Sequence, residues 1–350
     1  RRQSKGPADN TGENDQRLKS RKGGLIMKNF ALLNARTLDE AVSSLGSEWN
    51  EAVVMSGGTD LLGEMKKYLQ SPEKVVNLKT VNGLEGIVAD GDNIAILAET
   101  KIADIASDNT IKEHFPALAK AAENVASPQI RNMGTITGNI CQRPRCWYYR
   151  DTEVPCMKKG GIRCYSVAGV NTYHAIFGGG PCHIVHPSDT AVALMAFDTS
   201  LTIVDKYGTK EVPFSEFFVL PEDDASRENI LKPYQVVSKI SIKRPDSRIK
   251  SNFIKVQERE AWDFAVASVA VSMRLEGSTC REAKVVLGAA APIPWRSEAA
   301  ENELVGKSIS ESVAEAAGKA SVADSTPMTD NKYKVELFAN IVKRAVLELV

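Results

Sequence analysis

The sequence has no excess of either charge and no long apolar run. Its 350 residues contain 44 Lys and Arg against 44 Asp and Glu, so the formal net charge is zero. A balanced chain lacks the basic surplus that nucleic acids and anionic membranes attract. No apolar stretch approaches the roughly 18 residues that a membrane-spanning helix needs. We therefore expect neither a nucleic-acid partner nor a membrane span.

Common nucleotide-binding signatures are also missing. The chain contains neither a GxGxxG motif nor a GxxxxGK[ST] motif. Their absence disfavours a nicotinamide-binding Rossmann domain and a P-loop NTPase.

The first 26 residues are polar and show no periodicity. We expect them to be a disordered extension before a natural start at Met27. The pair Arg1-Arg2 is not followed by an apolar region, so it does not read as a twin-arginine export signal. The expected location is the cytoplasm, where thiols stay reduced, with co-export to the periplasm on a partner subunit as the alternative.

After residue 27 the pattern mixes helices and strands, which predicts an α+β protein. Thr37 and Glu40 form a capping box that opens a helix ending near Gly46. A polar, turn-like stretch within 220–247 separates a first unit (27–225) from a second (247–350). The pattern predicts strands at 52–55, 75–78, 94–97, 235–243, 252–258, 264–275 and 282–288, and helices at 101–108, 115–126, 297–306, 310–319 and 331–349, with a helix and then a strand in 189–205.

Two glycine-containing segments are candidates for binding an anion. Residues 56–60 (SGGTD) directly follow the predicted strand 52–55, and residues 131–139 read RNMGTITGN. Glycines permit positive φ and close backbone approach, and successive N–H groups in such a turn form an anion nest. A plain strand-to-helix turn is the alternative for each segment. Two such loops in one chain indicate a diphosphate held from two sides.

Five of the six cysteines lie within residues 141–182. Buried free thiols, disulfides, a zinc site and an iron–sulfur cluster are the alternatives. The spacing Cys146-x9-Cys156-x7-Cys164-x17-Cys182 contains no close CxxC pair, and it differs from a ferredoxin run. Spacing by itself leaves zinc and an iron–sulfur cluster both open.

Four segments, in their order, resemble the flavin-binding subunit of the molybdenum hydroxylases, the family of xanthine dehydrogenase, aldehyde oxidoreductase and carbon monoxide dehydrogenase. The resemblance covers essentially all of residues 27–350. The four segments are VVMSGGTDLL (53–62), IRNMGTITGN (130–139), HPSDTAVAL (186–194) and LGAAAPIPWRSEAAE (287–301).

This resemblance implies a fold and a cofactor. The fold is a two-part α/β FAD-binding domain, similar to that of vanillyl-alcohol oxidase, followed by an α/β domain like the C-terminal domain of carbon monoxide dehydrogenase flavoproteins. The residues implied to bind FAD are Met55, Ser56, Gly57, Gly58, Thr59, Asp60, Leu61, Gly134, Thr135, Gly138, Asn139, Ser188, Asp189 and Lys255. Trp262 stands where relatives that use nicotinamide have an acidic residue, which argues against NAD as the acceptor.

The resemblance also interprets the cysteine segment. A subset of the family, similar to periplasmic aldehyde oxidoreductase and hydroxybenzoyl-CoA reductase, carries an insertion after the second FAD motif that holds a [4Fe–4S] cluster. Here the insertion spans about 141–183. Its implied ligands are Cys146, Cys156, Cys164 and Cys182, which leaves Cys141 as an extra thiol.

The implied function is that of a redox subunit. A molybdopterin-binding large subunit would oxidise the substrate, and [2Fe–2S] clusters on a small subunit would pass electrons to FAD on this chain, in a heterotrimer or its dimer. The cofactors carry the chemistry, so no residue here needs to be a catalytic acid or base. A stand-alone flavin oxidoreductase and a non-catalytic zinc-binding scaffold are the alternatives.

Overall fold

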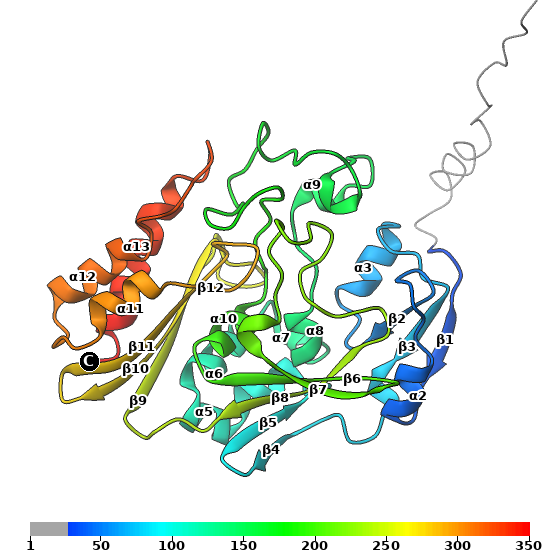
Figure 1. Cartoon of the computed structure of the whole chain (residues 1–350), viewed down its shortest axis with the longest axis horizontal. Helices are drawn as coiled ribbons and strands as arrows, with labels where there is room; N and C mark the ends of the chain where they lie inside the picture. Colours follow the sequence, from blue (N-terminus) through cyan, green and yellow to red (C-terminus); the bar gives the residue numbers. More distant parts are fainter. Residues whose placement is uncertain (1–26) are drawn as a thin grey trace, which may run out of the picture.

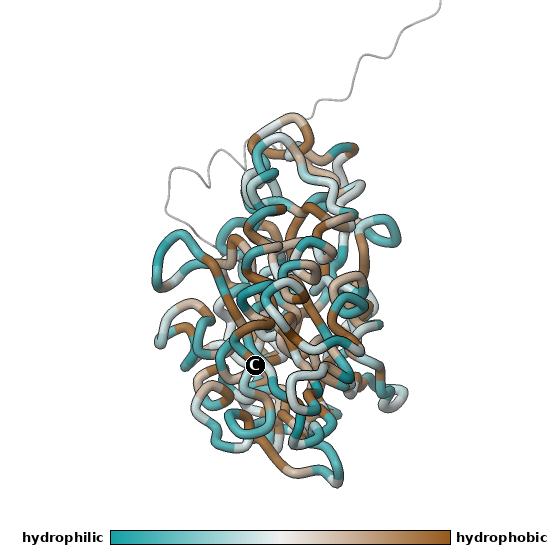
Figure 2. Tube along the Cα trace, turned by 90° about the vertical axis from the view of Figure 1, so that its left-hand side faces the viewer, coloured by the Kyte–Doolittle hydropathy of each residue, from teal (hydrophilic) through white to brown (hydrophobic). Residues whose placement is uncertain are grey.

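The computed structural model describes residues 27–350, which form three β-sheets and the helices that pack on them (Figure 1). The predicted extension, residues 1–26, lies outside the described part of the chain. Hydrophobic segments gather toward the middle of the molecule and hydrophilic ones form most of the outer loops (Figure 2). Within residues 27–350, no helix combines the length and the apolar character needed to cross a membrane.

The first sheet is small and parallel. Its strand order is β1 (Ala31–Asn34), β3 (Lys74–Asn77), β2 (Ala52–Met55). The helix α2 (Leu38–Ser43) connects β1 to β2 and begins at the predicted capping box. Thr37 accepts a hydrogen bond from the Glu40 amide, and the Glu40 carboxylate accepts one from the Arg36 amide at 2.7 Å. The first bond satisfies an N–H group that the first turn of a helix leaves free, whereas the second holds the amide before the N-cap in place of the Thr37 amide that a capping box predicts.

The second sheet is antiparallel and has five strands. Its order is β4 (Ile87–Asp90), β5 (Asn93–Leu97), β8 (Val236–Lys243), β6 (Thr199–Asp205), β7 (Gly208–Pro213). β8 pairs with both β5 and β6, so the chain completes this sheet only at residue 243, just before it enters the last unit.

Short helices connect the strands of the first two sheets. They are α3 (Leu61–Lys66), η1 (Leu78–Thr80), α4 (Ile102–Ser107), α5 (Asn109–His114), α6 (Pro116–Glu123), α7 (Pro128–Arg131), α8 (Ile136–Ile140), α10 (Asp189–Met195) and η3 (Phe214–Glu216). Of these helices, α3, α7, α8 and α10 contain or directly follow a predicted motif.

The third sheet belongs to the last unit and is buried on both faces. Its order is β12 (Trp295–Arg296), β11 (Thr279–Gly288), β10 (Ala267–Glu276), β9 (Ile249–Val256). Neighbouring side chains of β9 enter different cores: Phe253 packs with α6 and α10, and Ile254 packs with the C-terminal helices. Two-sided burial is complete only in the central strand β10, over residues 267–273, whereas β9 and β11 also carry exposed or half-buried polar side chains.

Three C-terminal helices cover one side of this sheet (Figure 1). They are α11 (Glu298–Leu304), α12 (Glu311–Ala320) and α13 (Tyr333–Leu347). On α13, Phe338, Val342 and Ala345 are fully buried, as their helical spacing predicts.

The cysteine segment 141–182 is mostly irregular, as its lack of periodicity predicts. It contains one turn of helix, α9 (Trp147–Arg150), and one 3₁₀ turn, η2 (Met157–Lys159). It contacts both ends of the molecule: Tyr149 donates to Glu64 of α3, and Asn171 bonds to Asp330 just before α13. In Figure 1 the segment forms the green loops around α9, between α3 and α13.

Candidate cofactor-binding site

A groove of about 3400 Å³ contains most of the predicted cofactor-binding residues. Small-molecule sites usually measure about 300–1,000 Å³, so this groove has room for an elongated dinucleotide. Its walls include the predicted residues Ser56, Gly57, Gly58, Thr59, Asp60, Leu61, Gly134, Thr135, Gly138, Asn139 and Asp189. Three other predicted residues, Met55, Ser188 and Lys255, are not part of its lining.

The first two glycine motifs lie directly against each other. Ser56 and Thr135 share a hydrogen bond between their hydroxyl groups, although 79 positions separate them. A Cβ atom on Gly57 would sit 2.2 Å from the Met133 carbonyl oxygen, closer than any side chain tolerates. Gly58 has φ of +72°, the left-handed region that glycine enters without strain. The chain therefore needs glycine at both positions to bring the two loops together.

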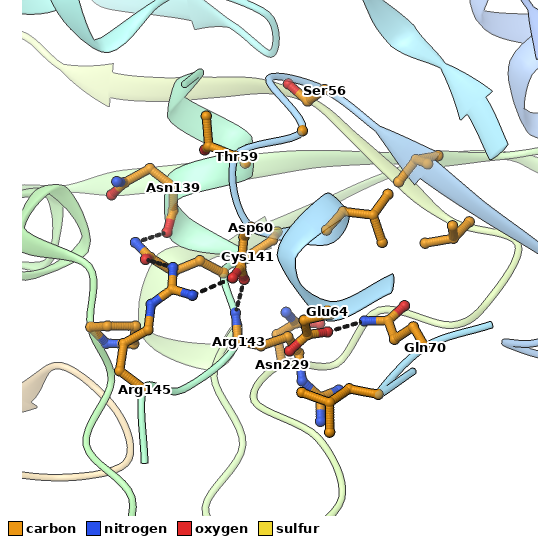
Figure 3. A pocket seen from close by; sticks show the side chains of 18 of the residues that line it. Ser56, Thr59, Asp60, Glu64, Gln70, Asn139, Cys141, Arg143, Arg145 and Asn229 are labelled. Carbon is orange, nitrogen blue, oxygen red and sulfur yellow. Dashed lines mark hydrogen bonds and ion pairs between the residues drawn. The ribbon is translucent and has the colours of Figure 1, made fainter. Parts of the chain in front are cut away.

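Asn139 joins the third motif to the second. Its side-chain oxygen accepts hydrogen bonds from Ser188 Oγ at 2.5 Å and from Thr190 Oγ1 at 2.7 Å. Ser188 also caps α10 by accepting from the Ala191 amide. Figure 3 shows Ser56, Thr59 and Asn139 on one part of the groove wall. The structure thus collects three motifs, spread from residue 56 to residue 190, around one cavity.

Asp189 and Lys255 form a buried ion pair between the first and last units. Lys255 Nζ lies 2.8 Å from Asp189 Oδ2, and it also donates to the Asn124 and Asp263 carbonyl oxygens. Burial raises the pKa of Asp189, and the Lys255 ammonium opposes that shift. All three Lys255 protons are directed at protein oxygens, so its predicted contact with a flavin ring stays a prediction.

Asp60 connects the first glycine motif to the cysteine segment (Figure 3). Its carboxylate accepts from the Arg143 amide at 2.8 Å, from Arg150 at 2.9 Å and from the Arg145 guanidinium. Burial opposes ionisation of Asp60, but the guanidinium groups of Arg145 and Arg150 outweigh it and lower the pKa. Glu64, one turn further along α3, is fully buried and accepts from Tyr149 Oη at 2.9 Å.

A buried carboxyl group, that of Glu99, lies next to Ser56 of the first glycine motif. Glu99 follows β5 and is 5% exposed. Burial raises its pKa to about 7, although the Ser56 hydroxyl partly offsets the shift. At neutral pH this carboxyl is therefore balanced between its neutral and charged forms.

The last unit contributes an aromatic corner to the groove. Trp262 and Phe264 both line it. Trp262 is 66% exposed and has φ of +57°, and its amide bonds to the Ala126 carbonyl oxygen. The Arg145 guanidinium lies 5.0 Å from the centre of the Phe264 ring. This corner brings the last unit within reach of the cysteine segment.

The four cysteines predicted as cluster ligands line one small, separate cavity. Its walls include Cys146, Cys156, Cys164, Cys182 and the ring of His174. Tyr148, Tyr149, Met157, Lys158, Tyr165 and Ile184 complete the lining. Tyr149 and Lys158 also line the large groove, so the two cavities are neighbours.

A tight turn explains how Cys156 and Cys164 come together. The Met157 amide donates to the Arg163 carbonyl oxygen at 3.0 Å, and the Gly161 amide donates to the Cys156 carbonyl oxygen at 3.0 Å. A Cβ atom on Gly161 would sit 1.8 Å from the Pro155 carbonyl oxygen. Glycine is therefore required in this turn.

The thiols in this cavity influence each other's ionisation. A hydrogen bond from Cys182 is the main reason that the pKa of Cys164 falls to about 4, and the same contact raises the pKa of Cys182. Burial raises the pKa of Cys146 to about 11. A metal binds cysteine as the thiolate, so a lowered pKa at Cys164 favours metal binding there.

The remaining two cysteines lie elsewhere. Cys141 lines the large groove rather than the cysteine cavity, and burial raises its pKa to about 12. Cys280 is far in the sequence from the other five cysteines, and it is fully buried in the core of the last unit.

The cysteine cavity differs from a single-ion site. No three or more His, Cys, Asp or Glu side chains in the described part of the chain are placed to hold one metal ion. A four-iron cluster has one iron for each thiolate, so its ligands surround a volume and need not meet at a point. Four thiols around a common cavity are the donor type that both zinc sites and iron–sulfur clusters use.

Several residues of the site were not predicted. Arg145 and Arg150 were missed because their partner, Asp60, is distant in sequence, although the run RPRC (143–146) placed charge beside a candidate ligand. His174 and Glu99 carried no signal at all, since a lone histidine or glutamate in a sequence does not reveal its burial.

Comparisons with known proteins agree with this geometry. Residues 28–244 match the family described as the FAD binding domain in molybdopterin dehydrogenase, and residues 252–349 match the CO dehydrogenase flavoprotein C-terminal domain. The chain is 32% identical over 282 residues to the aldehyde oxidoreductase FAD-binding subunit PaoB of Escherichia coli K12, covering 79% of this chain and 86% of that one.

Two further comparisons concern carbon monoxide dehydrogenase of Hydrogenophaga pseudoflava. Its medium chain is 26% identical over 327 residues, covering 92% of this chain and 97% of that one. A solved structure of this enzyme, in a form that lacks the Mo-pyranopterin moiety of its cofactor, matches with a TM-score of 0.73 and 26% identity over 93% of this chain and 98% of that one. The predicted α+β fold, with an FAD-binding domain before a CO dehydrogenase flavoprotein C-terminal domain, is confirmed. The chain belongs to the family of FAD-binding oxidoreductase subunits of molybdopterin dehydrogenases.

Proposed function

We propose that this protein holds two redox cofactors, FAD in the large groove and a [4Fe–4S] cluster in the cysteine cavity, within a molybdenum hydroxylase complex. FAD binding follows from the family, and the cluster, the contact residues and the assembly are the new parts of the proposal. The observation that carries it is the position of the two cavities: four cysteines surround one, and Tyr149 and Lys158 form walls of both.

The groove suits the diphosphate of FAD at its glycine motifs. Gly57 and Gly58 leave the backbone uncovered, and Ser56, Thr59 and Thr135 supply hydroxyl donors beside it. Backbone N–H groups in such turns bind phosphate oxygens. In this proposal the side chains of the three motifs orient the dinucleotide, and Asp189 and Lys255 hold the two units on either side of it.

The cysteine cavity suits a cluster by its donors and by its shielding. Cys146, Cys156, Cys164 and Cys182 supply the four thiolates, and cluster potential depends on exclusion of solvent and on hydrogen bonds to sulfur. Tyr149 is 3% exposed and lines both cavities, and the guanidinium groups of Arg143 and Arg150 lie 5.2 and 5.5 Å from its ring centre. In this proposal these side chains help to shield the cluster from solvent.

The partners follow from the family. We infer a molybdopterin-binding large subunit and a [2Fe–2S] small subunit, in a heterotrimer or its dimer. Bound FAD supplies the exchange between one-electron and two-electron transfer. In this proposal the residues of 27–350 bind, orient and shield the cofactors, which supply the redox chemistry.

Cofactor analysis of anaerobically purified protein tests the proposal. We expect about one FAD, four iron and four acid-labile sulfide per chain, the composition of a single [4Fe–4S] centre. FAD without iron overturns the cluster and keeps the flavin subunit. One bound zinc in place of iron favours a structural metal site. A chain that binds neither cofactor, even with its partner subunits, overturns the proposal as a whole.

A further inference from the structure

The cysteine cavity contains one imidazole whose position the cluster ligands do not explain. His174 is 3% exposed, and its Nε2 lies 3.3 Å from Cys146 Sγ. Its other ring nitrogen, Nδ1, is buried without a hydrogen-bond partner. The side chain that the ring contacts through a hydrogen bond is therefore a cysteine, by its sulfur atom.

The backbone that carries His174 is held by the last unit. Asn331 Nδ2 donates to the His174 and Ala175 carbonyl oxygens at 3.0 and 3.2 Å. Lys334, fully buried on α13, donates to the carbonyl oxygens of Tyr173 and His174 at 3.2 Å each. These bonds fix the main chain of residues 173–175.

Aromatic side chains fix the ring itself. Trp147 packs edge-on against His174 with 5.4 Å between ring centres, and Tyr148 lies 6.0 Å away. A ring held by its backbone and by two neighbouring rings has little freedom to turn. Its Nε2 is thus preorganised toward the sulfur of Cys146.

The chemistry of the bound state decides which atom carries the proton. A thiol can donate to Nε2, but a cysteine that ligates iron is a thiolate and can only accept. The contact persists with a bound cluster only if Nε2 carries a hydrogen.

We propose that His174 donates a hydrogen bond from Nε2 to the Cys146 thiolate and thereby sets the reduction potential of the cluster. This inference rests on the cluster proposed above. A donor at a ligand sulfur stabilises the reduced, more negative state more than the oxidised one, so it raises the potential. His174 acts through Cys146 and is a positioning residue rather than a ligand of iron.

Two variants of the full complex test the role of the donor. His174→Leu removes it, and His174→Gln places an amide nitrogen near the position of Nε2. The readout is the midpoint potential of the [4Fe–4S] signal, followed by electron paramagnetic resonance during a redox titration. We expect His174→Leu to weaken the reduced state about tenfold, a fall of about 59 mV for a one-electron couple. His174→Gln should restore most of this fall.

A matched control separates this effect from the loss of a buried histidine. His186 is also 3% exposed and its Nε2 also lacks a partner, but it packs on Phe218 and does not line the cysteine cavity. His186→Gln should leave the cluster potential unchanged. A fall as large as that of His174→Leu overturns the inference.

A measurement on the unaltered protein covers the case in which His174→Leu does not assemble a cluster. With ¹⁵N-labelled histidine, the electron paramagnetic resonance of the reduced cluster should show a weak hyperfine coupling to one nitrogen and a coupling to one exchangeable proton. Absence of both overturns the hydrogen bond, and a strong coupling overturns it in favour of direct iron coordination. Equal potentials in iron-replete wild type and His174→Leu overturn this inference alone, whereas a wild-type protein without iron overturns the cluster and this inference together.

Discussion

Lys255 Nζ lies 2.8 Å from Asp189 Oδ2, and both side chains are almost completely buried. The pair joins α10, beside the groove, to strand β9 of the last unit. A buried ion pair contributes little net stability compared with apolar packing, but removal of one partner leaves an unpaired charge in the interior.

We therefore predict that Lys255→Met lowers the free energy of unfolding by about 3–5 kcal/mol, measured by urea denaturation. The double variant Asp189→Asn with Lys255→Met should recover part of this loss, because no buried charge remains. As a control, Lys239→Met removes a partly exposed pair with Asp90 and should cost only about 0.2–1 kcal/mol. Equal losses in the two lysine variants would show that Lys255 stabilises by packing alone.

The close approach of the two glycine loops gives a second prediction. In Gly57→Ala the new methyl group meets the Met133 carbonyl oxygen, so the loops must separate. Overlap of this kind costs about 1–3 kcal/mol, which corresponds to about 5-fold to 150-fold weaker FAD binding if the bound state bears the whole cost. Bound flavin per chain, from absorbance after gel filtration, measures the effect.

Gly63 provides the matched control for this substitution. It lies in α3, six residues from Gly57, and a Cβ atom there would have nothing within 4 Å. Gly63→Ala should retain FAD as well as the wild type does. If both variants lost flavin equally, the contact between the loops would not be what holds the cofactor.

The sequence predicted the strongly patterned elements of this fold and missed the short exposed ones. Strand β2 was predicted at its observed bounds, and α13 with its buried face, because an apolar run or a helical period marks each of them. Strand β7 (GTKEVP) was missed because it is a mostly exposed edge strand with no alternation, and β1 and β4 are only four residues long. Their pairing is decided by distant strands rather than by their own residues.

The candidate site also contains some features that the sequence predicted and others that it missed. The two segments that contain Ser56 and Thr135 could each be predicted as an anion-binding loop from glycine and hydroxyl content. The union of these loops joins residues 79 positions apart, and the cysteine cavity depends on how a mostly irregular segment folds. Contacts such as Asp60 with Arg145, or His174 with Cys146, join side chains that no local pattern relates.

Glu99 makes the stability depend on pH. Burial raises its pKa from 4.5 to about 7, with the charges of Lys79 and Glu85 acting in opposite directions. Because the folded protein holds this proton more tightly than the unfolded chain, stability falls as pH rises from about 4.5 to about 7, and stays lower above that. The shift corresponds to roughly 3 kcal/mol. Glu99→Gln should abolish this loss.

Urea midpoints at pH 5, 6 and 8 measure the difference. Wild type and Glu99→Gln should diverge with rising pH, and the variant should be the more stable at pH 8. Glu282→Gln is the control, since this side chain is 64% exposed on β11 of the last unit and should not change the slope. Parallel curves for wild type and Glu99→Gln would mean that Glu99 finds a compensating partner.

The cysteines divide into four that surround a cavity and two that do not. Replacing any of Cys146, Cys156, Cys164 or Cys182 with serine should abolish stable iron binding, because a [4Fe–4S] cluster needs all four thiolates. Flavin should remain bound in these variants, since none of the four side chains lines the large groove. Iron, sulfide and flavin per chain, from anaerobic preparations, measure both effects.

The variant Cys141→Ser tests whether position in the cavity, rather than proximity in the sequence, identifies the iron ligands. Cys141 is only five positions from Cys146, so proximity in sequence would include it among the ligands, whereas the structure places it on the groove wall. We predict that Cys141→Ser and the remote Cys280→Ala both retain four irons. Loss of iron in Cys141→Ser, with iron retained in one of the four cavity variants, would mean that Cys141 replaces that cysteine as a ligand, which requires the segment 141–146 to refold around the cluster.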